Sequence, residues 1–498
     1  MWLCSVLVSM AGFFLSFAFA DLWTIISFSY TLLVIVSVVS VIIGRREPVK
    51  TLAWIMVITM VPVAGIVLYM AVGIDRRKQR IFNRKGALDN AVIDSFCREQ
   101  LNDIADPDLD LNPIVVRNKE FITLMLNNNK SLLTMRNRVE ILNNGDQTFP
   151  AMLEEMRRAE HFIHIESFIM EGGRVFDAFF EILADRVAHG VEVRVIYDSV
   201  GSRRFKDRDI ARMRSAGVDI RSFMPVIFTR FTSKVNYRNH RKIIVIDGRV
   251  AFTGGINIAD RYIDGVQNGI WRDTHMRITG ESVRFLQAIF VTDWAFVTGG
   301  EELRDAKYFP ASRVRNITPL QIASSGPDSD WASIMQAYFA AITRARHYIY
   351  VSTPYLLPNQ AILTALRVAS LSGVDVRLVI PLRGDNKIVS WASYSYVEGL
   401  LEAGVKVYLY QKGFNHSKFL VIDDAMCSIG SANLDIRSFE DDFEVQAIIY
   451  DPQVANRLKE CFMADVADSM EATPEMWASR PEFDLVMESL SRLLSPLL

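Results

Sequence analysis

Two nine-residue strings, NHRKIIVID and NHSKFLVID, place the same reactive side chains at matching positions in one chain. The first contains His240 and Lys242 and the second contains His416 and Lys418, so the pair recurs 176 positions later (416 minus 240). Residues two apart on a strand point to the same face, so each His is expected to project together with its Lys. An imidazole beside an ammonium group suits nucleophilic and acid–base chemistry on a phosphate ester.

The repeat extends beyond the His and Lys. Three more pairs match at the same offset of 176: Asp247 and Asp423, Gly254 and Gly430, and Asn257 and Asn433. Five matches at one offset indicate an internal duplication. A Gly-rich turn lets the backbone approach an anion closely, and an Asn amide can donate to that anion. We therefore predict that Asn257, Asn433 and Ser431 bind a substrate phosphate. Gly255 stands in the first half where the second half has Ser431.

Asp247 and Asp423 complete the two motifs, and we count them with the catalytic set. Each stands five residues after its Lys, where the expected strand runs into a turn. The Asp247–Gly248 pair is a strong hairpin signal. Because these positions are odd in register relative to the Lys, we interpret both carboxylates as structural groups that bond turn or neighbouring backbone groups.

Each half also supplies a carboxylate further along, Asp273 in WRDTH and Glu444 in DDFEV. A carboxylate that holds one imidazole nitrogen fixes the tautomer and raises the basicity of the ring, so we predict that these two orient the histidines. Glu166 in HIESF and Tyr355 in TPYLLP end the first strand of their halves. Pockets of α/β proteins form at strand ends, so we predict that both line the mouth of the site.

A pseudo-two-fold arrangement of the halves would bring both His, both Lys and both Asn residues to one pocket. One His can then attack phosphorus while the other protonates the leaving oxygen, which produces a covalent phosphohistidine intermediate. The sequence shows no carboxylate cluster with metal-ligand spacing, and the two ammonium charges can replace a metal, so we expect no metal and no other cofactor. Because the motif is symmetric, the residues alone leave open which His attacks first.

Short β-rich runs alternate with amphipathic helical stretches from about residue 110 onward, in the same order in both parts of the chain. This pattern predicts a duplicated α/β sandwich with two pseudo-symmetric halves. We place the first half at 113–315 and the second at 316–451. A C-terminal helical segment follows at 452–498.

The first 74 residues are predicted to be a transmembrane region. Residues 22–44 and 51–73 contain no charged side chain and are long enough to span a bilayer, and a third span at 2–20 is an alternative. Residues 75–112 are expected to form a basic juxtamembrane helical linker. The bias of positive charge favours a cytoplasmic position for the remainder of the chain, through six residues at its start: Arg76, Arg77, Lys78, Arg80, Arg84 and Lys85.

The composition of the chain argues against some classes of site. Half of the 498 residues are apolar and the net charge is −2, so whole-chain charge says little about partners. The four cysteines are scattered and show no C-x-x-C spacing, which argues against a zinc knuckle or a disulfide framework.

The doubled H-x-K-x4-D motif resembles the hallmark of the phospholipase D superfamily over roughly residues 110–450. Within that superfamily the chain is similar to the bacterial cardiolipin synthase family. Its similar segments are REPVKTLAWIMVITMVPVAGIVLYMAVG, NHRKIIVIDG, GGIN, WRDTH, TPYLLP, GSANLDIRSFE and SRLLSPLL. The resemblance implies condensation of two phosphatidylglycerol molecules to cardiolipin and glycerol without a metal, with His240 as nucleophile and His416 as acid and base.

The resemblance also implies phosphatidylglycerol and other anionic phospholipids as partners, no nucleic acid, and a multi-pass location in the bacterial inner membrane. An alternative is a phospholipase D-type hydrolase, or a transphosphatidylase with another alcohol acceptor, using the same two histidines. The site residues do not separate water from an alcohol as acceptor. Neither the acceptor nor the oligomeric state follows from the sequence.

Overall fold

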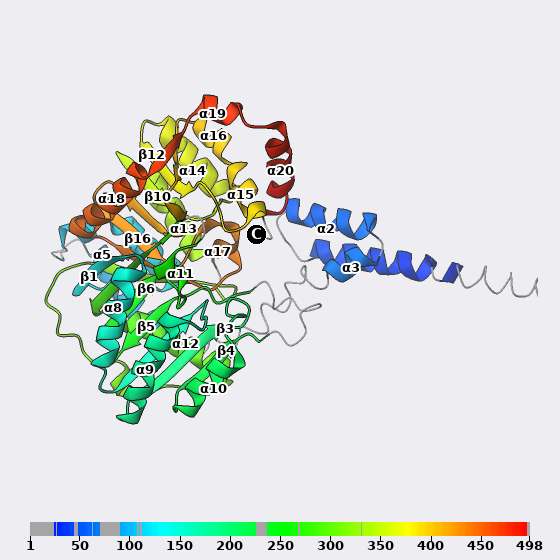
Figure 1. Cartoon of the computed structure of the whole chain (residues 1–498). Helices are drawn as coiled ribbons and strands as arrows, with labels where there is room; N and C mark the ends of the chain where they lie inside the picture. Colours follow the sequence, from blue (N-terminus) through cyan, green and yellow to red (C-terminus); the bar gives the residue numbers. More distant parts are fainter. Residues whose placement is uncertain are drawn as a thin grey trace, which may run out of the picture. The chain divides into compact units, whose positions relative to one another are not determined.

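The computed structural model describes residues 24–25, 27–43, 48–61, 63–69, 90–106, 109, 112–225, 237–266, 269–329 and 331–495. The chain divides into two compact units (Figure 1). The first comprises Met1–Arg80 with Ile227–Val235, and the second comprises Ile81–Val226 with Asn236–Leu498.

The first unit is helical where it is described. Residues 27–43 are helical, and α2 (Pro48–Met60) and α3 (Ala64–Leu68) follow. Val41, Ile58, Ile66 and Tyr69 form a small apolar core. Along the described residues, no helix combines the length and apolar character that crossing a bilayer requires. The alternative span at 2–20 lies outside the described residues.

A seven-stranded mixed sheet forms the first half of the second unit, in the order β1-β8-β6-β5-β2-β3-β4. Its strands are β1 (Asn137–Asn143), β2 (Phe162–Ser167), β3 (Glu192–Asp198), β4 (Asp219–Phe223), β5 (Ile243–Ile246), β6 (Val250–Gly254) and β8 (Thr274–Gly280). Its helices are α8 (Asn144–Arg157), α9 (Arg174–Ala188), α10 (Asp207–Ser215), α11 (Arg261–Asp264), α12 (Val283–Thr298) and the short η3 (Ala306–Tyr308).

An eight-stranded sheet forms the second half, in the order β19-β13-β12-β10-β15-β16-β18-β9. Its strands are β9 (Leu320–Ser325), β10 (Tyr348–Ser352), β12 (Asp375–Pro381), β13 (Lys406–Tyr410), β15 (Phe419–Ile422), β16 (Met426–Gly430), β18 (Glu444–Ile449) and β19 (Ser469–Ala472). Its helices are α13 (Ser333–Arg344), α14 (Gln360–Leu371), α15 (Lys387–Tyr394), α16 (Val397–Leu401), α17 (Ile436–Glu440), α18 (Pro452–Ala467), α19 (Pro474–Ala478) and α20 (Glu482–Arg492).

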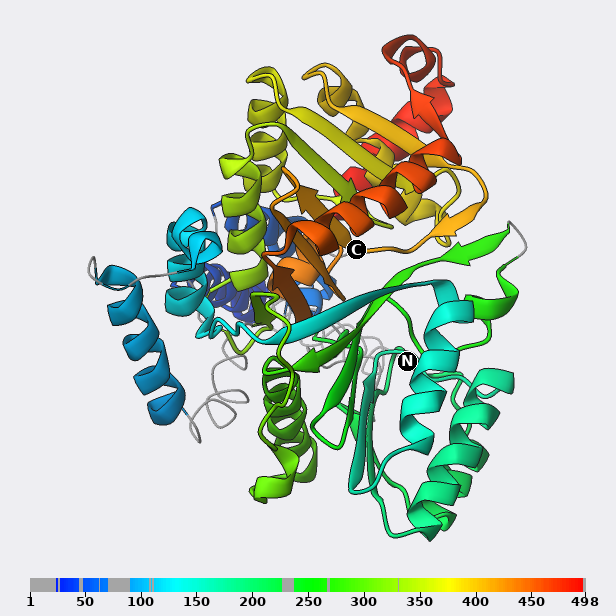
Figure 2. The same cartoon turned by 90° about the vertical axis from the view of Figure 1, so that its left-hand side faces the viewer.

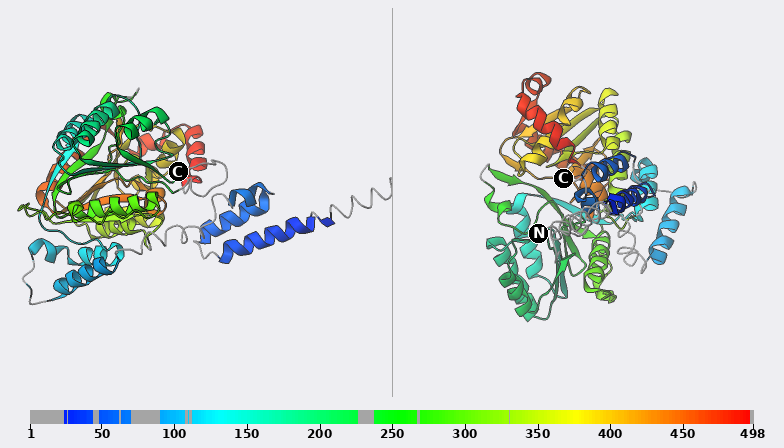
Figure 3. Two further views of the ribbon diagram at one scale, coloured as in Figure 1. Left: turned by 90° about the horizontal axis from the view of Figure 1, so that it is seen from below. Right: turned by 90° about the vertical axis from the view of Figure 1, so that its right-hand side faces the viewer.

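The two sheets repeat one topology, which confirms the predicted duplication. In each half a parallel trio, β2-β3-β4 or β10-β12-β13, is joined through its first strand to an antiparallel hairpin, β5-β6 or β15-β16. Strand β8 or β18 then pairs with the hairpin, and β1 or β9 closes the edge. Helices cover both faces of each sheet (Figures 2 and 3). The duplicated α/β fold is therefore present.

The apolar core contains residues from segments on both sides of the domain boundaries that the sequence predicts. One apolar cluster joins the two sheets through α12 and α18, with Phe290, Trp294, Leu458 and Phe462 fully buried in it. Helices α5 (Asn90–Ala105), α6 (Pro113–Arg117) and α7 (Lys119–Asn129) contribute to the core of the second half, although part of this segment was assigned to the first. The segment 452–498 is also not wholly helical, because β19 pairs with β13.

Backbone segments of the two halves pair directly along the boundary between them, which we call the seam. Strand β14 (Gly413–Asn415) pairs in parallel with β7 (Ile270–Arg272), and Asn239 forms a bridge with Phe443. In each of these pairs, a segment that leads into one His-Lys string lies beside the segment that carries the other half's carboxylate. The fold therefore places the predicted site residues along one seam.

Candidate active site

The two His-Lys strings occupy equivalent positions in their sheets. His240 and Lys242 stand immediately before β5, and His416 and Lys418 stand immediately before β15. The backbone N–H of His240 donates to the carbonyl of Phe443 at 2.9 Å, and that of His416 donates to the carbonyl of Arg272 at 2.7 Å. Each His is thus anchored by its backbone to the opposite half.

The imidazole rings are held across the same seam. Nδ1 of His240 lies 2.9 Å from Oε1 of Glu444, and Nδ1 of His416 lies 2.6 Å from Oδ2 of Asp273. The sequence predicted both orienting carboxylates but did not predict that each would serve the His of the other half. With Nδ1 engaged in this way, Nε2 is the nitrogen of each ring that remains for chemistry.

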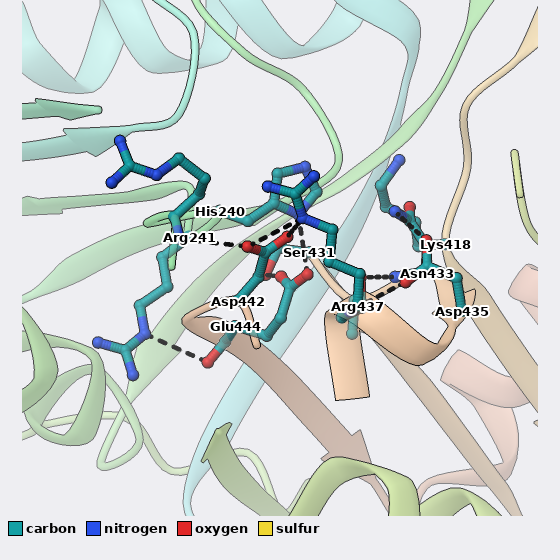
Figure 4. A network of polar contacts seen from close by, with 12 residues as sticks. His240, Arg241, Lys418, Ser431, Asn433, Asp435, Arg437, Asp442 and Glu444 are labelled. Atoms are coloured by element: carbon teal, nitrogen blue, oxygen red, sulfur yellow. Dashed lines mark hydrogen bonds and ion pairs between the residues drawn. The ribbon is translucent and has the colours of Figure 1, made fainter. Parts of the chain in front are cut away.

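The two lysines turn toward the histidine backbones. Nζ of Lys242 donates to the carbonyl of His240 and Nζ of Lys418 donates to that of His416, each at 2.6 Å. Burial lowers the pKa of Lys242 to about 7 and that of Lys418 to about 8. Figure 4 shows His240 beside Glu444 and Asp442, with Lys418 of the second half in the same region.

Burial is the main influence on the pKa of both histidines. Burial lowers the pKa of His240 to about 4, although Glu444 opposes this. Burial, followed by the charges of Lys418, Lys242 and His240, holds the pKa of His416 well below its usual range. Both rings are therefore neutral at pH 7 when no anion lies between them.

The two orienting carboxylates differ. Burial raises the pKa of Asp273 to about 6, against the opposing charge of Lys418. Burial also disfavours the charged form of Glu444, but contacts with His240, Lys242 and the Ser431 hydroxyl outweigh it and lower the pKa of that carboxyl. Glu444 is thus ionised through the neutral range, whereas Asp273 changes charge near its lower edge.

The motif aspartates lie at the far ends of their strands. Oδ1 and Oδ2 of Asp247 accept the backbone N–H groups of Glu160, His161 and Phe162 at 2.8–2.9 Å. Asp423 accepts three equivalent N–H groups, from residues 346–348, each at 2.8 Å. Both aspartates have positive φ, 52° and 54°, as the hairpin turns require. Each carboxylate ties the hairpin to the start of the neighbouring strand.

The predicted phosphate ligands are engaged by protein groups. Asn257 accepts the backbone N–H of Ile169 at 3.0 Å and donates to the hydroxyl of Tyr262 at 2.6 Å. Asn433 donates to Oδ2 of Asp435 at 3.0 Å. The side-chain amide of each Asn has a second N–H, which remains available to a ligand.

Ser431 and Gly255 show why the two turns differ. The buried Ser431 hydroxyl donates to Oε2 of Glu444 and accepts the backbone N–H of Val445. A Cβ at Gly255 would lie 2.0 Å from Oδ1 of Asp273. A hydroxyl therefore braces Glu444 in one half, and the absence of a side chain makes room for Asp273 in the other.

The two residues expected at the mouth have different positions. Glu166 is only 1% exposed and accepts the side-chain amide of Asn239, so it lies beneath the His240 string and the prediction that it lines the mouth is wrong. The period-2 pattern of β2 did not reveal this because both faces of the strand are buried. Tyr355 is partly exposed, and its hydroxyl donates to Oδ2 of Asp385 at 3.0 Å.

Two buried ion pairs behind the carboxylates were not predicted. Arg241 pairs with Asp293 of α12 and donates to the carbonyl of Glu444 at 3.2 Å. Arg272 pairs with Asp465 of α18 at 2.8 Å and donates to the carbonyl of Asp273. Their signal in the sequence was one charged residue within each of the apolar stretches FVTDWAF and FMADVA.

Aromatic rings surround the histidines. The ring of Phe168 lies 4.8 Å from that of His240. The rings of Trp271 and Phe414 lie 5.4 Å and 5.8 Å from that of His416. Among the described residues, no group of three or more His, Cys, Asp or Glu side chains could hold a metal ion. The functional groups that the described site presents include imidazole, ammonium and carboxylate.

Comparisons with known proteins give matches over most of the chain. The family described as "Cardiolipin synthase, PLD-like domain" matches residues 152–294 and 338–466, and "Phospholipase_D-nuclease N-terminal" matches residues 32–73. A cardiolipin synthase of Geobacillus thermodenitrificans is 40% identical over 457 residues, which cover 91% of this chain and 90% of the relative.

Two further relatives extend the comparison. A protein named cardiolipin synthase 2 of Staphylococcus epidermidis is 37% identical over 473 residues, which cover 94% of this chain and 97% of that protein. Among solved structures, a phosphatidylserine synthase of Haemophilus influenzae matches with a TM-score of 0.56 at 15% identity, covering 77% of this chain and 100% of that chain. That structural likeness concerns the fold alone.

Proposed function

The chain belongs to the cardiolipin synthase family of the phospholipase D superfamily, and from this membership we propose that it condenses two phosphatidylglycerol molecules to cardiolipin and glycerol. The observation that carries the proposal is the crossed pairing of His240 with Glu444 and of His416 with Asp273. The crossing orients both imidazoles, and they lie close enough for the charge of His240 to act on His416. Two oriented imidazoles are what a two-step transfer of a phosphatidyl group requires.

In the first step, Nε2 of His240 attacks the phosphorus of one lipid. The phosphorus–nitrogen bond forms as the bond to the glycerol oxygen breaks, and His416 gives that oxygen its proton. Lys242 and Lys418 face the non-bridging oxygens, where negative charge grows in the transition state. The bound phosphodiester anion also raises the pKa of His416, which supplies the proton that the ring needs for this role.

In the second step, the terminal hydroxyl of a second phosphatidylglycerol loses its proton to His416 and attacks the phosphohistidine. The phosphorus–nitrogen bond breaks, cardiolipin is released and His240 returns to its neutral form. Asn257 and Asn433 direct their remaining amide hydrogens at the phosphate, and Asp247 and Asp423 hold the strands that position the lysines. The assignment of His240 as nucleophile follows the family resemblance.

We further place the protein in the bacterial inner membrane, anchored by spans at about 22–44 and 51–73, with the catalytic unit on the cytoplasmic side. The support is the uncharged, apolar sequence of these segments, the basic flank that follows, and the family match at residues 32–73. Substrates that are lipids require the site to reach a bilayer surface.

Incubation of the purified full chain with phosphatidylglycerol alone tests the activity. We expect cardiolipin and glycerol in equal amounts. Phosphatidic acid without cardiolipin would assign the chain to the hydrolases instead, because water would then be the acceptor. Turnover in EDTA should match turnover without it; activity lost in EDTA and restored by a divalent ion would contradict a metal-free mechanism.

A further inference from the structure

A cavity of about 650 Å³ lies at the opposite end of strand β15 from His416. The turn between β15 and β16, the link between α13 and β10, and the junction of α6 with α7 surround it. Asp423 lines it and stands five positions after Lys418. At about 3.3 Å per residue along a strand, roughly 17 Å separate the two residues. The cavity is therefore distinct from the site described above.

Positive charge dominates the lining. Arg117, Arg344, Arg346 and His347 are all exposed to the cavity, and they come from α6 and from the link between α13 and β10. Within the described part of the chain, neither Arg117 nor Arg346 has an ion-pair or hydrogen-bond partner for its guanidinium group. Arg344 pairs with Glu120 at 2.7 Å, in an exposed contact that solvent screens.

The single carboxylate in the lining does not neutralise this charge. Both oxygens of Asp423 already accept backbone N–H groups, from Arg346, His347 and Tyr348. A ligand would therefore meet two guanidinium groups that have no other partner. Such groups recognise phosphate through paired N–H donors in a planar fork.

Part of the remaining lining is apolar, with Phe121, Ile422 and Met426 buried; Asn118 and Thr343 add polar side chains. A cavity of this volume suits a small organic ligand rather than an isolated ion. We propose that this cavity binds a phosphate-bearing organic anion of the glycerophosphate class, held by Arg117 on one side and Arg346 on the other. A lipid head group and a free phosphate ester share this chemistry. The inference does not depend on the proposed function.

Titration calorimetry of the full chain in detergent with sn-glycerol 3-phosphate tests the proposal. Because the active site also attracts phosphate, we expect two classes of site in the wild-type chain. Arg117→Gln combined with Arg346→Gln should remove one class, with affinity lowered at least about tenfold by the loss of two charge-assisted contacts. The control is Arg157→Gln combined with Arg158→Gln, two exposed arginines at the C-terminal end of α8, which should leave both classes unchanged.

A parallel titration with inorganic phosphate tests whether the organic part of the ligand is recognised. Loss for sn-glycerol 3-phosphate alone in the double variant supports the proposal, whereas equal loss for both ligands would reduce the cavity to a site for phosphate and overturn the assignment to an organic anion. An isotherm of the double variant identical to that of the wild type overturns the proposal. The single variants, each expected to show a smaller loss, and retained turnover at the active site exclude misfolding as the cause.

Discussion

The two halves share a topology but give their histidines different surroundings. His240 is held by Glu444, which Ser431 braces, and the neighbouring Arg241 and Asp293 are charged. At the matching position after His416 stands a neutral residue, Ser417, whose hydroxyl lies 3.1 Å from that of Thr274. The duplication gives both halves the same strand arrangement. The side chains around each orienting carboxylate differ, and they influence how easily that carboxylate ionises.

The largest difference is expected from removing the charge of the orienting carboxylates. Asp273→Asn and Glu444→Gln keep the shape of each side chain but present an N–H to Nδ1, so each His adopts the wrong tautomer. We expect kcat to fall by about 10²–10⁴-fold in both variants. The measurement is cardiolipin formation from phosphatidylglycerol under saturating conditions.

The same two variants should differ in stability. The pKa of Asp273 is raised to about 6 in the folded chain, so its ionisation opposes folding above that pH, and Asp273→Asn should stabilise the protein at pH 8 by about 1–3 kcal/mol. The pKa of Glu444 is lowered, so its charge favours folding and Glu444→Gln should not stabilise. Equal shifts of the unfolding midpoint in both variants would remove this distinction between the halves.

A second comparison concerns the two buried ion pairs. Asp465→Asn leaves Arg272 buried without its carboxylate partner, which costs about 3–5 kcal/mol in comparable cases. Asp293→Asn should cost less, because Glu166 also lies close to Arg241 and is relieved of repulsion from Asp293. Denaturant unfolding of the catalytic unit measures both, and a larger loss for Asp293→Asn would contradict this reading.

A smaller effect is expected from exchanging the turn residues. Gly255→Ser places a side chain where Asp273 lies, so we expect at least about a tenfold loss of kcat from the displaced carboxylate. Ser431→Gly removes one bond to Glu444 but leaves its contact with His240, and should cost less. Comparable losses in the two variants would show that the turns are interchangeable.

The smallest effect is a pH dependence with two limbs, which come from two residues of the first half. As pH falls through about 6, Asp273 gains a proton and kcat/KM should decline. As pH rises through about 7, Lys242 loses its charge and KM should rise because phosphate binding weakens. Lys242→Arg keeps its charge, so the basic limb should move to higher pH; an unmoved limb would exclude Lys242 as its source.

Much of this site was predictable because its residues recur at a fixed spacing. The duplicated α/β fold and the His-Lys strings follow from repeated motifs, and the two orienting carboxylates were expected because each half carries an acidic residue further along the chain. The crossing of His240 to Glu444 does not, since it depends on the pairing of β14 with β7 and on the Asn239 bridge to Phe443, contacts between residues far apart in the chain. The position of Glu166 was missed because a strand buried on both faces gives no alternation.

The central claim is that the two strings form one pocket with unequal roles, His240 as nucleophile and His416 as acid. A phosphatidyl donor with p-nitrophenol as its leaving group needs no acid, so it isolates the first step. With His416→Ala, we expect a burst of one equivalent of nitrophenol and a phosphatidyl adduct that mass spectrometry locates on His240. With His240→Ala, we expect neither. An adduct on His416 in the His240→Ala variant, or equal bursts in both variants, would contradict the account.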